Sequence, residues 1–135
     1  MRVLDAGVVV AAFASWHEAH DLAVVEMALR PQIAAHAMVE SFSVLTRLPA
    51  PHRAPADLVA SYLAAAFPSS PIALTGEQTA HLLDRLPALA ISGGAVYDAL
   101  IAETVRVAGG ELLTLDRRAL DTYRRVGCPA ELLRP

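Results

Sequence analysis

Short apolar runs alternate with longer helical stretches along this chain, and that alternation constrains its fold more than any other feature. Strands are expected at residues 2–4, 32–35, 71–74 and 111–115. Helices are expected at residues 8–13, 17–30, 36–48, 55–67, 75–86, 95–107 and 117–125. Such alternation predicts an α/β protein in which helices cover both faces of a short central parallel sheet, giving three layers, α/β/α. Right-handed crossovers then bring the carboxyl ends of the strands to one edge.

The length of 135 residues predicts a single domain over 1–135. Cys128 is the only cysteine, so no internal disulfide forms and a reducing, cytoplasmic location is expected. No membrane span is expected, because the uncharged stretch 58–76 is interrupted by Pro68 and Pro71. Hydrophobic residues make up 55% of the chain, an excess that predicts a dimer or partner interface.

Charge composition excludes some chemistry and leaves nucleic-acid binding open. The sequence contains no lysine, which excludes a P-loop lysine and Schiff-base catalysis. Its net charge of −3 is unusual for a protein that binds a polyanion. If four acidic residues hold metal and are set aside, −3 + 4 leaves +1. Net charge therefore neither supports nor excludes a nucleic-acid partner.

Two aspartates directly follow expected strands. Asp5 comes after residues 2–4, and Asp116 comes after residues 111–115. Ligands of open parallel sheets bind outside the carboxyl ends of the strands, so both aspartates stand at a functional position. The alternative is that each only caps the helix that follows it.

Asp98 and Glu40 are expected on helices. Asp98 shares a helix face with Ile101 and Val105, where an unpaired carboxylate is costly and needs a cation, a donor network or a metal. A favourable interaction with the helix dipole is the simpler account. Glu40 lies on a polar stripe with Arg47, which a solvated helix face explains equally well.

The four acids are more informative together. Two carboxylates about 4 Å apart repel by about 4 kcal/mol at an effective dielectric near 20. A cluster of them persists only if metal ions or protons neutralise it. Mg²⁺ and Mn²⁺ prefer oxygen ligands, and a bound ion can activate water for phosphodiester cleavage. The pattern favours a metal-dependent nuclease.

Four segments carry a family resemblance. R-V-L-D-A-G-V-V-V-A-A-F around Asp5 resembles the start of a PIN domain, and A-M-V-E-S-F-S-V-L-T-R-L around Glu40 resembles its second acidic motif. A-V-Y-D-A-L-I-A-E-T-V-R around Asp98 and L-L-T-L-D-R-R around Asp116 resemble the third and fourth. Order and spacing match over nearly the whole chain, which implies a PIN-like domain.

At this size the chain is most similar to VapC-type toxins of type II toxin–antitoxin systems. The resemblance implies an Mg²⁺- or Mn²⁺-dependent endoribonuclease, a small antitoxin that binds the toxin groove, and frequent formation of homodimers. It implies that Asp5, Asp98 and Asp116 hold metal and that Glu40 helps to hold or orient the ion and its water. One departure is that Ala6-Gly7 follows the first aspartate, where the family commonly has Thr or Ser.

Other readings stay open. A phospho-acceptor receiver domain also clusters aspartates at a sheet edge, but it uses a lysine that this chain lacks. A catalytically silent PIN-like interaction module, and a nuclease acting on another nucleic acid, are the remaining alternatives. Thr114 and Asp121 stand close enough in sequence to Asp116 to assist the site.

Two further groups of residues give weaker indications of a function. Four arginines, Arg117, Arg118, Arg124 and Arg125, either contact RNA phosphates or form a salt-bridged surface around Asp121. Zinc at His17 and His20 lacks an evident third ligand.

Overall fold

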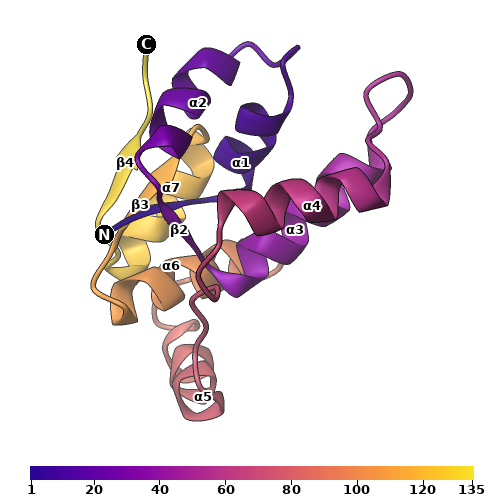
Figure 1. The fold of residues 1–135 in the computed structure, drawn as a ribbon. Helices are drawn as coiled ribbons and strands as arrows, with labels where there is room; N and C mark the ends of the chain where they lie inside the picture. Colours follow the sequence, from indigo (N-terminus) through magenta and orange to yellow (C-terminus); the bar gives the residue numbers. More distant parts are fainter.

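The computed structural model describes residues 1–135 as seven helices around a four-stranded sheet (Figure 1). The strands are β1 (Arg2–Leu4), β2 (Gln32–Ile33), β3 (Glu111–Thr114) and β4 (Ala130–Leu132). The helices are α1 (Ala6–Phe13), α2 (His20–Ala28), α3 (Ala35–Arg47), α4 (Ala56–Ala66), α5 (Gly76–Arg85), α6 (Ala95–Val107) and α7 (Arg117–Val126).

The sheet is parallel throughout and has the strand order β2-β1-β3-β4. The first strand therefore lies inside the sheet, with Leu4 paired to Ile33 on one side and to Leu113 on the other. Both β1 and β3 are short and almost fully buried, as expected for strands covered on two faces. This confirms the predicted α/β class with a short parallel sheet.

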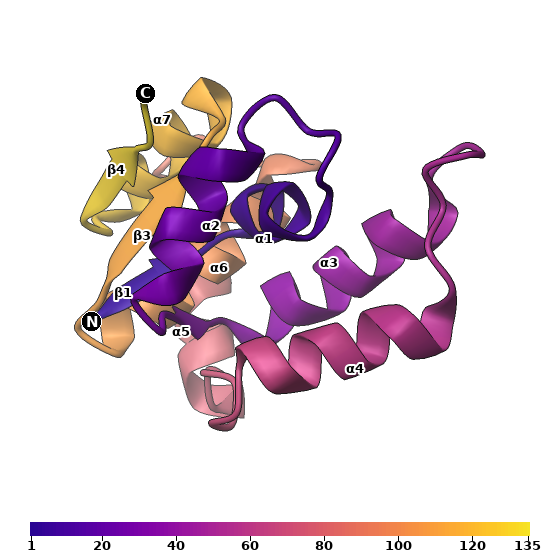
Figure 2. The ribbon, with the colours of Figure 1, turned by 45° about the horizontal axis from the view of Figure 1, so that its top comes forward.

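Helices lie on both sides of the sheet, as right-handed crossovers require. Helices α1 and α2 pack against each other on one side, and α6 and α7 pack together on the other. Helices α3 and α4 lie side by side and extend away from the sheet, while α5 packs against α6 (Figure 2). The three-layer arrangement is thus extended by a two-helix arm.

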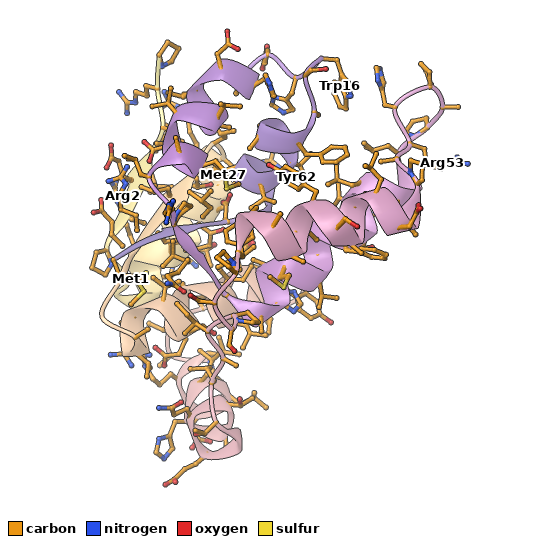
Figure 3. All side chains as sticks on the ribbon, viewed as in Figure 1. Met1, Arg2, Trp16, Met27, Arg53 and Tyr62 are labelled. Atoms are coloured by element: carbon orange, nitrogen blue, oxygen red, sulfur yellow. The ribbon has the colours of Figure 1, made fainter.

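One hydrophobic core joins the sheet to its helices. Val3, Leu4, Leu112 and Leu113 from the central strands are completely buried in it. The arm is tied to this core by an edge-to-face contact between Phe13 of α1 and Tyr62 of α4, whose ring centroids are 5.0 Å apart (Figure 3). The sites built on the arm are therefore held at a fixed place relative to the sheet.

The observed strands differ from the expected ones at two places. The expected strand at 71–74 is reduced to an isolated bridge between Ile72 and Ala34. Ile72 donates its amide to the Ile33 carbonyl and accepts the Ala35 amide, and the residues from there to the cap at Thr75 form no further bridge. Strand β4, which was not predicted, pairs Ala130 with Leu112. It lies at the edge of the sheet and is only partly buried, so it lacks the apolar run by which the inner strands are detected.

Helix boundaries follow local chemistry. Thr75 and Gln78 form the predicted capping box at the start of α5, with both reciprocal hydrogen bonds present. Helix α2 begins at His20, three residues later than predicted, because the His17 ring nitrogen Nδ1 accepts the Ala19 amide and holds the preceding residues in a turn. No helix has the length and apolar character needed to cross a membrane.

A buried ion pair joins α5 and α6 below the sheet. Glu103 is only 2% exposed and accepts hydrogen bonds from Arg85, at 2.8 Å, and from Arg106. Burial alone would raise the pKa of Glu103, but the hydrogen bonds and charges of Arg106 and Arg85 outweigh it and lower that pKa. Glu103 is therefore a structural carboxylate that holds α5 against α6.

Candidate metal-dependent active site

All four predicted acidic residues line one pocket of about 190 Å³. Asp5 follows β1 and Asp116 follows β3, and these neighbouring parallel strands end at the same edge of the sheet. Asp98 enters from the first turn of α6, and Glu40 from α3. Residues far apart in the sequence therefore meet at the position where open parallel sheets bind ligands.

Asp5 is the buried member of this group, with 5% of its surface exposed. Its Oδ1 accepts the Val8 amide at 3.2 Å and so caps α1. Its Oδ2 accepts the Tyr123 hydroxyl at 3.0 Å. Burial raises the pKa of Asp5 to about 6, although hydrogen bonds from Thr114, Val8 and Tyr123 act in the opposite direction. The orientation of this carboxylate is therefore fixed, while its charge is poorly compensated by the protein.

Asp98 and Asp116 keep more of their ligand capacity. The half-buried carboxylate of Asp98 accepts no hydrogen bond from the protein. Burial raises its pKa, and the negative charges of Glu40 and Asp116 raise it further. Asp116 caps α7 by accepting the Arg118 amide at 2.8 Å through Oδ1, which leaves Oδ2 without a donor. The predicted need of Asp98 for a partner is thus unmet within the chain.

Glu40 lies at the rim of the pocket. Its carboxylate is 40% exposed and stands 3.7 Å from Nε2 of His36, one turn earlier on α3. Capping and surface solvation, the two simpler accounts of these acids, are thus partly correct. Asp5 and Asp116 do cap helices and Glu40 does reach solvent, but each also faces the common pocket.

The donor set suits a hard divalent cation. Every charged group that lines the pocket is a carboxylate, and no arginine enters it to neutralise them. Oxygen-only coordination is what Mg²⁺ and Mn²⁺ prefer. No three His, Cys, Asp or Glu side chains stand close enough together to form a ready ligand cluster. The pocket therefore has the chemistry for such an ion, and its side chains have to turn inward to bind one.

Tyr123 and Thr114 contact Asp5, and the acidic motifs alone did not identify them as its partners. Tyr123 is almost fully buried on the inner face of α7, and its hydroxyl reaches a residue 118 positions earlier. Burial and the charge of Asp5 raise the pKa of Tyr123, so the hydroxyl stays a donor. A tyrosine on an apolar helix face needs a partner for its hydroxyl, and this was the available signal. Thr114, buried beneath the pocket, accepts the Asp116 amide at 3.0 Å.

Several other candidates lie outside the pocket. Asp121 is exposed and pairs with Arg125 at 2.6 Å, which favours the salt-bridged surface over a role in the site. His20 uses Nδ1 to contact the Ala11 carbonyl at 2.8 Å, and no metal-binding group forms around it. The largest pocket, about 670 Å³, lies around Arg30 at the start of β2 and contains no acidic side chain.

Comparisons with known proteins show which sequences and which fold the chain resembles. The family model described as PIN domain matches residues 2–125. Ribonuclease VapC40 of Mycobacterium tuberculosis (strain CDC 1551 / Oshkosh) is 45% identical over 129 residues, covering 96% of each chain. Ribonuclease VapC27 of Mycobacterium tuberculosis (strain ATCC 25618 / H37Rv) is 40% identical over 126 residues, covering 92% of this chain and 90% of that protein.

A solved structure with the same fold is VapBC2 from Rickettsia felis, crystallised with a DNA fragment from their promoter. The two chains superpose with a TM-score of 0.66 over 98% of each, at 14% sequence identity. At that identity the likeness concerns the fold.

Proposed function

Because the chain belongs to the PIN domain family, we propose that it is a ribonuclease of the VapC type, the toxin of a toxin–antitoxin pair. The observation that carries this proposal is the pocket in which Asp5, Glu40, Asp98 and Asp116 meet. The curated relatives are ribonucleases, and they match almost the entire chain. The reaction is hydrolysis of an RNA phosphodiester, in which a bond from water to phosphorus forms as the bond to the leaving ribose oxygen breaks.

Mg²⁺ or Mn²⁺ is the proposed cofactor, held by Asp5, Asp98 and Asp116. When bound, such an ion supplies charge stabilisation at the phosphate and an activated water. Asp5 provides a fixed oxygen, since Val8 and Tyr123 hold its carboxylate. Asp98 and the free oxygen of Asp116 complete the anionic wall. Glu40 at the rim orients water and accepts its proton.

The missing hydroxyl after the first aspartate is compatible with this role. Ala6 and Gly7 line the pocket floor where related domains commonly carry Thr or Ser. Thr114 contributes a hydroxyl to the same pocket from the neighbouring strand. Positioning of the ion is therefore assigned to the carboxylates and to Thr114.

Cleavage of a mixed-sequence RNA tests the proposal. The purified protein should cleave it with Mg²⁺ or Mn²⁺ and stop when EDTA is added. Metal should raise the melting temperature of the parent protein, because only the folded state binds the ion. Asp98→Asn should abolish both this rise and the cleavage. Asp84→Asn makes the same change on an exposed carboxylate outside the pocket and should alter neither. Cleavage that persists in EDTA would refute the proposed mechanism, and so would a protein that does not cleave RNA with either metal.

The proposed partners are a small antitoxin and a second copy of the chain, in the cytoplasm. The exposed Val39 and the partly buried Met38 and Phe42 line a groove between α3 and α4 with only hydrophobic walls. Such a groove suits an apolar protein segment. Co-expression with a candidate antitoxin should suppress cleavage and protect this groove, and sedimentation should report the dimer.

A further inference from the structure

A second pocket, of about 410 Å³, adjoins the acidic one on the side of the arm. The two share Glu40 and Asp98, so these carboxylates stand between them. The outer pocket is walled by His36 and Arg47 from α3 and by Tyr97 from α6. An RNA chain with one phosphate in the acidic pocket would pass through the outer pocket on one side of that phosphate.

The outer pocket contains a preformed aromatic stack. The rings of His36 and Tyr97 are nearly parallel, at 6°, with centroids 5.3 Å apart. Tyr97 nevertheless remains 58% exposed, so it keeps surface that no protein group covers. A ring already held by a neighbour loses little conformational freedom when a further ring stacks on it. Every nucleic-acid base has a π-face, which makes such a ring a platform for an unpaired base.

A cation stands in the same pocket. Arg47 donates to the Ser43 hydroxyl at 2.9 Å and has no carboxylate partner. It lies seven residues after Glu40 on α3, about 10 Å along the helix axis. Its guanidinium is therefore available to the RNA phosphate next to the one at the acidic pocket. At that position it does not neutralise the carboxylates.

We propose that Tyr97, stacked on His36, and Arg47 form a subsite that takes one unpaired RNA base and its adjacent phosphate beside the scissile bond. The inference rests on the proposed ribonuclease function. It adds the residues that select RNA that is unpaired at the scissile bond. In duplex RNA the bases are already stacked on one another, so no base face is free to stack on Tyr97.

The test is binding of fluorescently labelled RNA, which is independent of turnover. An Asp116→Asn background prevents cleavage and keeps the α7 cap, because asparagine retains the acceptor. Tyr97→Leu in this background should raise the Kd for a single-stranded oligoribonucleotide about 5- to 100-fold, and Tyr97→Phe should stay within about twofold. Affinity for a matched RNA duplex should not respond to either change.

Trp16 offers a matched control. It is 48% exposed, and its ring contacts that of His52 at a tilt of 33° with centroids 4.2 Å apart. It lines neither of these pockets and lies near the α3–α4 loop that carries Arg53 (Figure 3). Trp16→Leu should therefore leave RNA binding unchanged. Arg47→Gln should reduce the slope of log Kd against log salt by about 0.7, a change that Tyr97→Leu should not produce.

The outcomes separate the subsite from the activity. If the parent protein cleaves and binds RNA but Tyr97→Leu binds it as tightly, the subsite is overturned and the nuclease stands. Equal losses on single-stranded and duplex RNA also overturn it. If Tyr97→Leu weakens only the antitoxin complex, the stack is part of a protein interface. If the parent protein neither binds nor cleaves RNA, both proposals fail together.

Discussion

Asparagine in place of Asp5 should stabilise the metal-free protein. The variant keeps the shape of the side chain and an oxygen that can accept the Val8 amide, so the α1 cap is retained. Its amide group can donate to the Tyr123 oxygen, which reverses that hydrogen bond without removing it. What the substitution removes is a negative charge at a buried position that faces Asp98.

The magnitude follows from the pKa of Asp5. A move from the ordinary value of 3.8 to about 6 means that ionised Asp5 destabilises the fold by about 3 kcal/mol at neutral pH. Because the folded pKa is raised, the parent protein recovers this stability as pH falls through about 6 and has recovered all of it below 3.8. The advantage of Asp5→Asn should therefore be largest above pH 7 and should vanish near pH 4.

Urea denaturation in EDTA, repeated from pH 4 to pH 8, measures this advantage directly. Adding Mg²⁺ to about 1,000 times Kd should reverse the order of stability, since it stabilises the parent by about 4.1 kcal/mol, more than the advantage of about 3 kcal/mol, and the variant has lost a ligand. Asp84→Asn is the control for loss of an exposed charge. The reasoning is refuted if Asp5→Asn is destabilised at pH 8 in EDTA, or if its advantage does not depend on pH.

Three further substitutions test the supports of the site and fold. Glu103→Gln should lower the free energy of unfolding by about 1–3 kcal/mol, less than a fully buried pair, because its two arginine partners are each about 40% exposed. Since the folded pKa of Glu103 is lowered, its stabilisation is present above pH 4.5 and should fade as the pH falls and the carboxylate is protonated. Urea titrations should show this pH dependence in the parent and not in the variant. Tyr123→Phe should cost about 1–3 kcal/mol in EDTA and weaken Mg²⁺ binding measured by calorimetry, because Asp5 loses a donor; unchanged metal affinity would count against its positioning role. Thr75→Ala should lower stability by about 1 kcal/mol without affecting cleavage, since the capping box with Gln78 lies outside the acidic pocket.

Much of the fold was predictable because its signals are local. The helix at 95–107 was predicted with the bounds that α6 has, since its apolar period, its glycine turn and its closing glycines are all adjacent in sequence. That Asp5 and Asp116 lie together followed from the rule that parallel strands end at a common edge, whereas Asp98 and Glu40 lie on helices and were joined to them only through the family resemblance. Their roles in catalysis remain a prediction.

The missed features depend on partners distant in sequence. The bond between Tyr123 and Asp5 spans almost the entire chain, and nothing near either residue specifies it. Burial of Glu103 requires Arg85, which lies on another helix and 18 residues earlier. Strand β4 forms because β3 offers it an edge, and its own residues give little indication of a strand.

The order in which the sheet is assembled has a consequence during protein synthesis. The first strand emerges first, but its inner neighbour β3 and the tyrosine that orients Asp5 are both encoded near the end of the chain. A nascent chain that stops before Glu111 carries three of the four acids and lacks the strand, the fourth acid and the hydroxyl that complete their pocket. Assembly of the pocket therefore has to wait until the segment through Tyr123 has left the ribosome.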